Sequence, residues 1–128
     1  MTALQTIELE LPPLPASIGR ARDALSGLED VPPDVHQSAV LVTSELVTNG
    51  IQHGSGDAGA VLTFRAQRFD GRLMLEVVNQ ATTGERPIVQ AGDPMRSSGR
   101  GLAIVALLAD SWGTDTGRQT RVWCELAI

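Results

Sequence analysis

The sequence predicts an α+β fold, a two-layer sandwich in which helices cover one face of a mixed, mainly antiparallel sheet. Three observations support this prediction. A length of 128 residues with 42% hydrophobic content suits one domain with one core. Apolar residues recur at helical spacing in three segments, and polarity alternates as in strands in five others. A sheet built from hairpins can bury one face under helices and expose the other to water. From the length and composition we expect a single domain over residues 1–128.

The first half of the chain predicts one strand and two helices. The alternating segment 6–11 is typical of a short strand, and Pro12-Pro13 stops it. Apolar residues spaced by three and four predict a helix over 16–27 and a second over 33–53. The second helix has the stronger periodicity. It begins at the Pro32-Pro33 pair, which interrupts the preceding pattern.

The second half predicts four strands and one helix. Asp70-Gly71 suits a tight hairpin turn between two alternating segments. Residues 80–98 contain Gly and Pro without a sustained period, which is typical of a functional loop or lid. An apolar helix is expected over 102–109, with a turn near 116–118. The expected strands span 60–68, 72–79, 111–115 and 119–127.

Charge and composition exclude several classes of function. Ten Lys plus Arg against fifteen Asp plus Glu give a net charge of −5, which disfavours direct contact with nucleic acid. Cys124 is the only cysteine, which excludes an internal disulfide framework, and its alternating surroundings predict a buried structural thiol. The longest apolar run is far shorter than a membrane span and no signal pattern opens the sequence, so we expect a cytoplasmic protein that does not contact membranes.

Glu45 and Asn49 lie four residues apart in the second expected helix, so their side chains should emerge from one face a turn apart. A carboxylate there can act as a base on a water or hydroxyl, and a carboxamide oxygen can bind Mg²⁺. The alternative is an ordinary solvated helix face.

A glycine-rich turn precedes the third expected helix. Glycines permit close approach of the backbone to a ligand, and the free N–H groups at a helix start attract phosphate. With the long loop before it, the turn predicts a phosphate-binding site, although the same pattern also occurs in ordinary loops. The residues of this turn are Ser98, Gly99, Arg100, Gly101 and Leu102.

Taken together, the segments 44–49, 99–105, 108–113 and 120–123 resemble the GHKL superfamily of ATPases, which includes histidine kinases, gyrase, MutL and heat-shock chaperones. The resemblance is closest to the small anti-sigma-factor serine-kinase branch. It covers roughly residues 15–127, and the order and spacing of the segments agree with that branch.

The resemblance implies ATP and Mg²⁺ as cofactors. Glu45 matches the glutamate that activates the attacking hydroxyl, and Asn49 matches the Mg²⁺-binding asparagine. Gly99 and Gly101 match glycines near the phosphates, and Thr120 matches a hydroxyl residue near the adenine.

The resemblance weakens at the adenine end. Where the family has an aspartate that accepts a hydrogen bond from the adenine amino group, this chain has Asn79, and of the glycines that follow only Gly84 remains. Losing a charge-assisted hydrogen bond costs about 1.5–3 kcal/mol, so we expect weaker adenine binding. His53, one turn beyond Asn49, either contacts the lid or phosphate or is a capping or exposed residue.

Two functions remain open. In the first, the protein transfers the γ-phosphoryl group of ATP to a serine of an antagonist protein and sequesters a sigma factor. Related regulators often pair, so a homodimer is one form that the resemblance implies. In the second, it is a protein-binding module of the same fold that has lost tight nucleotide binding and acts by sequestration alone.

Overall fold

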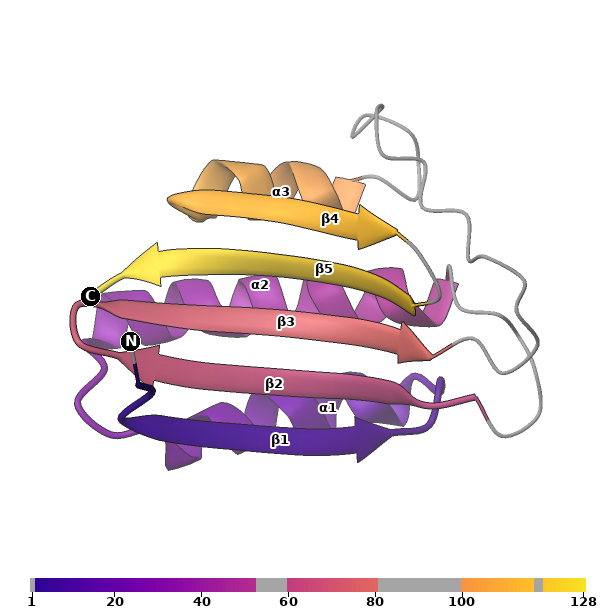
Figure 1. Ribbon diagram of the computed structural model, residues 1–128, viewed down its shortest axis with the longest axis horizontal. Helices are drawn as coiled ribbons and strands as arrows, with labels where there is room; N and C mark the ends of the chain where they lie inside the picture. The colour runs from indigo at the N-terminus through magenta and orange to yellow at the C-terminus, as the bar shows by residue number, and fades with distance from the viewer. Residues whose placement is uncertain (1, 53–59, 81–99, 117–118) are drawn as a thin grey trace.

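The computed structural model describes residues 2–52, 60–80, 100–116 and 119–128, and it shows one five-stranded sheet with all the helices on one face (Figure 1). The strand order is β1-β2-β3-β5-β4, and each neighbouring pair is antiparallel. The α+β sandwich is thus confirmed, with a sheet that is antiparallel rather than mixed. The elements are β1 (Gln5–Leu11), α1 (Ala16–Ala24), η1 (Leu25–Gly27), α2 (Pro33–Gln52), β2 (Leu62–Phe69), β3 (Arg72–Gln80), α3 (Arg100–Leu108), β4 (Ser111–Thr116) and β5 (Gln119–Ala127).

Prolines set the boundaries in the first half of the chain. β1 ends at Leu11, immediately before Pro12-Pro13, and the buried Ser17 hydroxyl donates a hydrogen bond to the Pro12 carbonyl at 2.6 Å. Pro33 occupies the first helical position of α2, where its fixed φ is suitable and its missing N–H is not needed. The helix expected over 16–27 is α-helical only to Ala24, because its last turn tightens into the 3₁₀ segment η1.

The hairpin between β2 and β3 closes as the Asp70-Gly71 pair predicts. Phe69 pairs with Arg72 across the two-residue turn, and Gly71 adopts a φ of +82°, which glycine reaches without a Cβ clash. α3 begins at Arg100, two residues before the expected start. The loop expected over 80–98 was placed one residue early, because Gln80 still belongs to β3, where it pairs with Gln119 of β5. Residues 81–98 and His53 lie outside the described residues.

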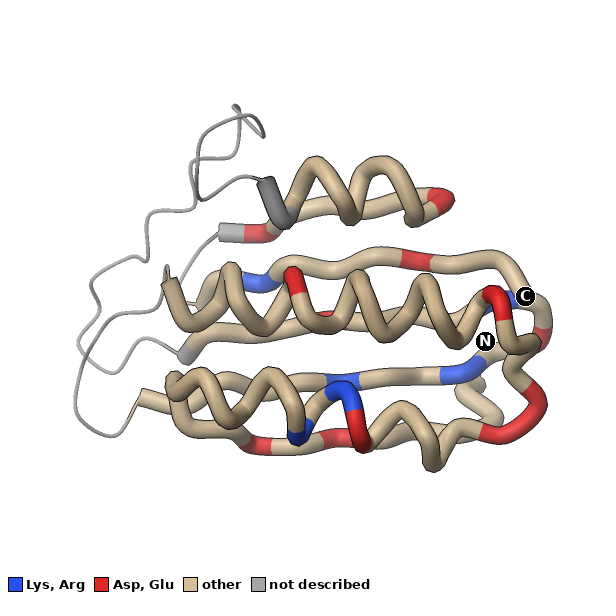
Figure 2. Tube along the Cα trace, turned by 180° about the vertical axis from the view of Figure 1, so that it is seen from behind, with Lys and Arg blue, Asp and Glu red and all other residues tan. Residues whose placement is uncertain are grey.

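The core lies between the sheet and the helices. Leu46 and Val47 of α2 are fully buried, as their spacing predicts, and Phe64 and Leu75 meet them from β2 and β3. Cys124 also faces this core from β5, and it is fully buried. Seen from behind, α1, α2 and α3 lie side by side over the sheet, with α2 in the middle (Figure 2).

The other face of the sheet carries a row of alternating charges, one from each strand. Glu76 of β3 forms the centre, since its carboxylate pairs with Arg65 of β2 at 3.0 Å and with Arg121 of β5. Arg65 also pairs with Glu8 of β1 at 2.9 Å, and Arg121 pairs with Asp115 of β4 at 3.0 Å. These ion pairs link five strands across a face that the described helices do not cover.

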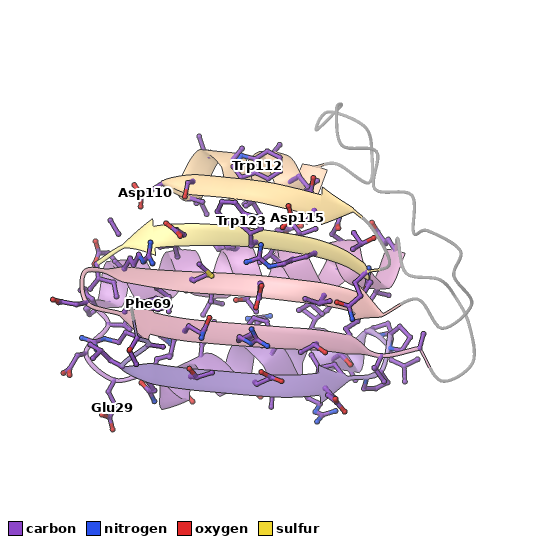
Figure 3. All side chains as sticks on the ribbon, in the orientation of Figure 1. Glu29, Phe69, Asp110, Trp112, Asp115 and Trp123 are labelled. Atoms are coloured by element: carbon purple, nitrogen blue, oxygen red, sulfur yellow. The ribbon has the colours of Figure 1, made fainter. Side chains whose placement is uncertain are left out.

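Trp123 lies beside this row of charges. It projects from β5, next to Asp115 of β4 (Figure 3), and the Arg121 guanidinium lies 5.6 Å from the centre of its ring. Its partner in the register is Gly113, where an added Cβ would come 2.8 Å from the Trp123 ring. Glycine is therefore needed at this position of β4 to accommodate the indole.

In the part of the chain that the structure describes, no helix is both long and apolar enough to cross a membrane.

Candidate functional site

Four elements converge at one end of the sheet. The C-terminal ends of α2 and β3 and the N-terminal ends of α3 and β5 all point toward the same end, opposite to the two chain termini (Figure 1). Residues from segments as distant as 49 and 120 are thereby brought together. The predicted site residues that the structure describes lie on these four elements.

Asn79 and Thr120 face each other across β3 and β5. They are direct partners in the antiparallel register, so their Cβ atoms lie within roughly 4.5–5.5 Å of each other. Both side chains point toward the helices, because they continue the alternation of the buried residues Val77 and Val122. Asn79 is 5% exposed and Thr120 is 2% exposed, so both polar groups are removed from bulk water.

These two side chains carry unsatisfied hydrogen-bonding atoms. Among the described residues, neither the Oδ1 atom of Asn79 nor the Oγ1 atom of Thr120 has a hydrogen-bond partner. A buried polar atom without a partner costs about 1–3 kcal/mol. Two such atoms at adjacent register positions are well placed to bind a polar ligand, which would supply the missing partners.

Gly50 brings the end of α2 close to this pair. A Cβ atom added at Gly50 would come 3.0 Å from Cγ1 of Val77, 3.3 Å from Cδ2 of Leu62 and 3.4 Å from Oδ1 of Asn79. The missing side chain thus allows the helix to approach β2 and β3 closely. Gly50 was given no role from the sequence, although a glycine within the last turn of a strongly periodic helix was the signal for such an approach.

Asn49, the residue before Gly50, is buried, whereas Glu45 one turn earlier is partly exposed. The two hydroxyls beside them bond within the helix: Ser44 donates to the Val40 carbonyl at 2.9 Å, and Thr48 donates to the Ser44 carbonyl at 2.6 Å. Among the described residues, no side-chain hydrogen bond occupies the Glu45 carboxylate or the Asn49 carboxamide, so both can meet a ligand. Burial of Asn49 also argues against an ordinary solvated face.

The start of α3 supplies the fourth part of the site. The backbone of Arg100 and Gly101 lies in the first turn of the helix, where N–H groups have no partner within the helix, and Leu102 is buried against the core. The remaining residues assigned to the phosphate and adenine ends, Gly84, Ser98 and Gly99, lie outside the described residues.

The arrangement has two chemically distinct halves. The Asn79–Thr120 pair offers buried, neutral hydrogen-bonding groups beside apolar side chains, which suits a flat heteroaromatic ring with polar edges. Glu45, Asn49 and the first turn of α3 offer an acid, an amide oxygen and backbone donors, which suit a phosphate chain with a divalent cation.

Comparison with known proteins gives two findings. A family model described as histidine kinase-like ATPase domain matches residues 11–125 of this chain. Twelve chains of known structure also match, and one of them is the histidine kinase domain of the blue-light activated histidine kinase from Erythrobacter litoralis EL346.

That structure has a TM-score of 0.61 and 22% sequence identity, and the match covers 88% of this chain and 59% of the other. At this identity the likeness shows a shared fold. Among curated proteins, none matches the sequence of this chain.

Proposed function

Because this chain belongs to the family of histidine kinase-like ATPase domains, we propose that it binds ATP with Mg²⁺ and transfers the γ-phosphoryl group to a serine of an antagonist protein. In this proposal it is a cytoplasmic regulator of the anti-sigma-factor serine-kinase branch, and a further surface sequesters a sigma factor. The order and spacing of the segments 44–49, 99–105 and 120–123 support that branch.

The observation that carries nucleotide binding is the pair of buried oxygens without partners. A purine base presents ring nitrogens and a substituent at position 6 that can complete the hydrogen bonds of Asn79 and Thr120. Leu62 and Val77, which approach Gly50 from the sheet, supply apolar contacts beside the same pair. The residues present therefore fit a purine nucleotide.

The residues of α2 fit the phosphate end. Asn49 would provide one oxygen to Mg²⁺, which commonly takes its other ligands from phosphates and water. When bound, Mg²⁺ would offset the negative charge of the phosphates. The first turn of α3 adds backbone N–H donors, which stabilise phosphate oxygens without needing a charged side chain.

Glu45 would act on the acceptor serine. Its partly exposed carboxylate can receive the proton of the serine hydroxyl while the serine oxygen bonds to the γ-phosphorus. The bond from the γ-phosphorus to the bridging oxygen breaks, and ADP leaves with that oxygen. Positioning and charge stabilisation supply most of the rate enhancement in such transfers.

The test is a transfer assay with γ-labelled ATP, Mg²⁺ and the proteins that a pull-down from the native cell recovers. We expect label on a serine of one such protein, and we expect Glu45→Ala to abolish transfer while ATP binding persists. Asp34→Ala is the matched control, because Asp34 is an exposed acid in the first turn of the same helix, far from its C-terminal end. Absence of transfer, or transfer that Glu45→Ala leaves intact, would refute the kinase proposal.

A second candidate is a module that acts by sequestration alone, and Asn79 favours it. The neutral amide of Asn79 forms a hydrogen bond that contributes about 0.5–1.5 kcal/mol, against about 1.5–3 kcal/mol for a hydrogen bond to a charged carboxylate. Calorimetric titration with ATP and ADP in the presence of Mg²⁺ separates the candidates. Binding with a measurable Kd, made tighter by Asn79→Asp, supports the first, and no heat at millimolar nucleotide supports the second.

A further inference from the structure

The hydrogen-bonding groups of the Asn79–Thr120 pair bear on which purine the site accepts. We propose that the nucleotide site accepts 6-oxo purine nucleotides, such as ITP and GTP, as well as ATP. This inference rests on the proposed nucleotide binding, and it names Asn79 as the residue that determines base specificity. Its basis is that Asn79 and Thr120 can each act as donor or acceptor.

Purines differ at position 6 in the direction of their hydrogen bonds. Adenine carries an amino group there, which donates, and its N1 atom accepts. Guanine and hypoxanthine carry a carbonyl there, which accepts, and their N1 atom donates. A side chain that only accepts therefore suits the amino group and opposes the carbonyl.

Asn79 can satisfy both patterns. Its carboxamide offers Oδ1 to an amino group, or, after a half-turn about its terminal bond, Nδ2–H to a carbonyl. The Oδ1 atom has no partner among the described residues, so a half-turn breaks no hydrogen bond of this oxygen in that part of the chain. Gly50 also has no side chain next to this oxygen, where a Cβ would come within 3.4 Å.

Thr120 adapts in the same way. Its hydroxyl can rotate to donate to a ring nitrogen or to accept from an N–H group, and Oγ1 likewise lacks a partner in the described part of the chain. Because Thr120 lies directly opposite Asn79 in the register, both groups lie on the same side of the sheet, where one base can reach both.

In the part of the chain that the structure describes, no buried charged side chain lies on the helix side of the sheet to favour one purine. Among the described residues, the buried polar or charged side chains are Ser17, Thr43, Asn49, Thr63, Glu76, Asn79 and Thr120. Glu76 is the only ionisable one of these, and its carboxylate pairs with arginines on the opposite face of the sheet. The choice of base is therefore determined by neutral groups that are both donors and acceptors.

Calorimetric titration of the whole chain with ATP, ITP and GTP in Mg²⁺ tests the inference. ITP isolates the change at positions 6 and 1, since it lacks the 2-amino group of GTP. We expect the Kd values for ITP and ATP to agree within about threefold, because both sets of hydrogen bonds are satisfied. ATP binding with ITP at least tenfold weaker would overturn the inference and leave the proposed function standing, and failure of all three nucleotides to bind would overturn both.

Asn79→Asp tests the residue itself. A carboxylate only accepts, so the ratio of the ITP and ATP dissociation constants should widen to about tenfold or more. Gln119→Glu is the matched control, because it adds the same charge on an exposed residue next to Thr120 and should leave the ratio unchanged. A ratio that Asn79→Asp does not alter, in a variant whose thermal unfolding matches the wild type, would contradict the assignment.

Discussion

Gly50 of α2 lies against Asn79 of β3, with so little space between them that a Cβ on the glycine would come 3.4 Å from the Asn79 side-chain oxygen. The same Cβ would come 3.0 Å from Val77, closer than side chains normally approach. The close contact between helix and sheet at the candidate site therefore depends on a residue without a side chain.

We expect Gly50→Ala to lower the free energy of unfolding by about 1 kcal/mol, because overpacking against Val77 outweighs the gain of up to about 1 kcal/mol in helix propensity. Nucleotide affinity should fall as well, since Asn79 must shift. Gly19→Ala is the matched control: an added Cβ meets nothing within 4 Å in α1, so the substitution should stabilise by about 0.5–1 kcal/mol. Urea denaturation measures whether each substitution lowers or raises the free energy of unfolding. Stabilisation by both substitutions would contradict the packing argument.

Thr120→Val should lower nucleotide affinity without lowering the stability of the protein. The Thr120 hydroxyl oxygen is buried without a partner among the described residues, so a methyl group of similar shape should leave stability unchanged or raise it by about 1 kcal/mol. Nucleotide affinity should fall about three- to tenfold, because a hydrogen bond to the base is lost. Denaturation without ligand and calorimetry with ATP measure the two effects. A large loss of stability without ligand would show that the hydroxyl has a structural partner.

Glu76→Gln should destabilise the protein by about 1–3 kcal/mol. The Glu76 side chain is 6% exposed and pairs with two arginines, whereas the amide that replaces its carboxylate has no charge and keeps only one acceptor oxygen for the two guanidinium groups. The cost stays below that of a fully buried pair, because both arginines are partly exposed and water can solvate them.

Asp115→Asn is the control for this row of charges, since Asp115 is 67% exposed and its loss should cost less than about 1 kcal/mol. Urea denaturation at low salt measures both variants. Equal effects would mean that burial does not determine the strength of these pairs.

Cys124 should not react in the folded protein. Burial raises the pKa of its thiol to about 12, so almost no thiolate exists near neutral pH, and the side chain is fully buried. We expect a thiol reagent such as dithionitrobenzoate to react at pH 8 only at the rate of unfolding, and at once in denaturant. Rapid labelling of the native protein would contradict the buried position.

The same thiol predicts a pH dependence of stability. The pKa of the thiol in the folded protein lies above its unfolded value of about 8.5. Its contribution to the free energy of unfolding is therefore complete below about pH 8.5 and is lost as the pH rises toward 12. The free energy of unfolding should therefore fall by up to about 1.4 kcal/mol per pH unit in this window. The sequence contains no tyrosine, and its ten basic residues are all arginine, so Cys124→Ala should remove most of this slope.

The secondary structure followed from the sequence because its signals are local. Helical spacing located α2 to within a residue at its described end, and the Asp70-Gly71 pair located the β2–β3 hairpin. The start of α3 was placed two residues late, since Arg100 and Gly101 were interpreted as a turn although their backbone already forms the first helical turn. Periodicity cannot resolve such ends, because the first residues of a helix need not follow its apolar pattern.

The sequence predicted some residues of the candidate site and missed others. Glu45 and Asn49 were named from their spacing on a helix, and Asn79 and Thr120 from the family resemblance; the structure places Asn79 opposite Thr120. Gly50 was missed because a glycine's role depends on what lies across the gap, and the gap here is formed by β2 and β3. The pairing of Glu76 with Arg65 and Arg121 was missed for the same reason, since the three lie on different strands.

The sequence by itself determined the α+β class and the five strands and three helices, because these depend on local periodicity and composition. It also showed that Glu45 and Asn49 share one face of a helix. Only the tertiary structure decided the strand order, in which β5 lies between β3 and β4. That order places Thr120 beside Asn79 and leaves both oxygens buried without partners in the described residues. Contacts between residues so distant in the chain arise from packing the whole sheet under the helices, and no local pattern encodes them.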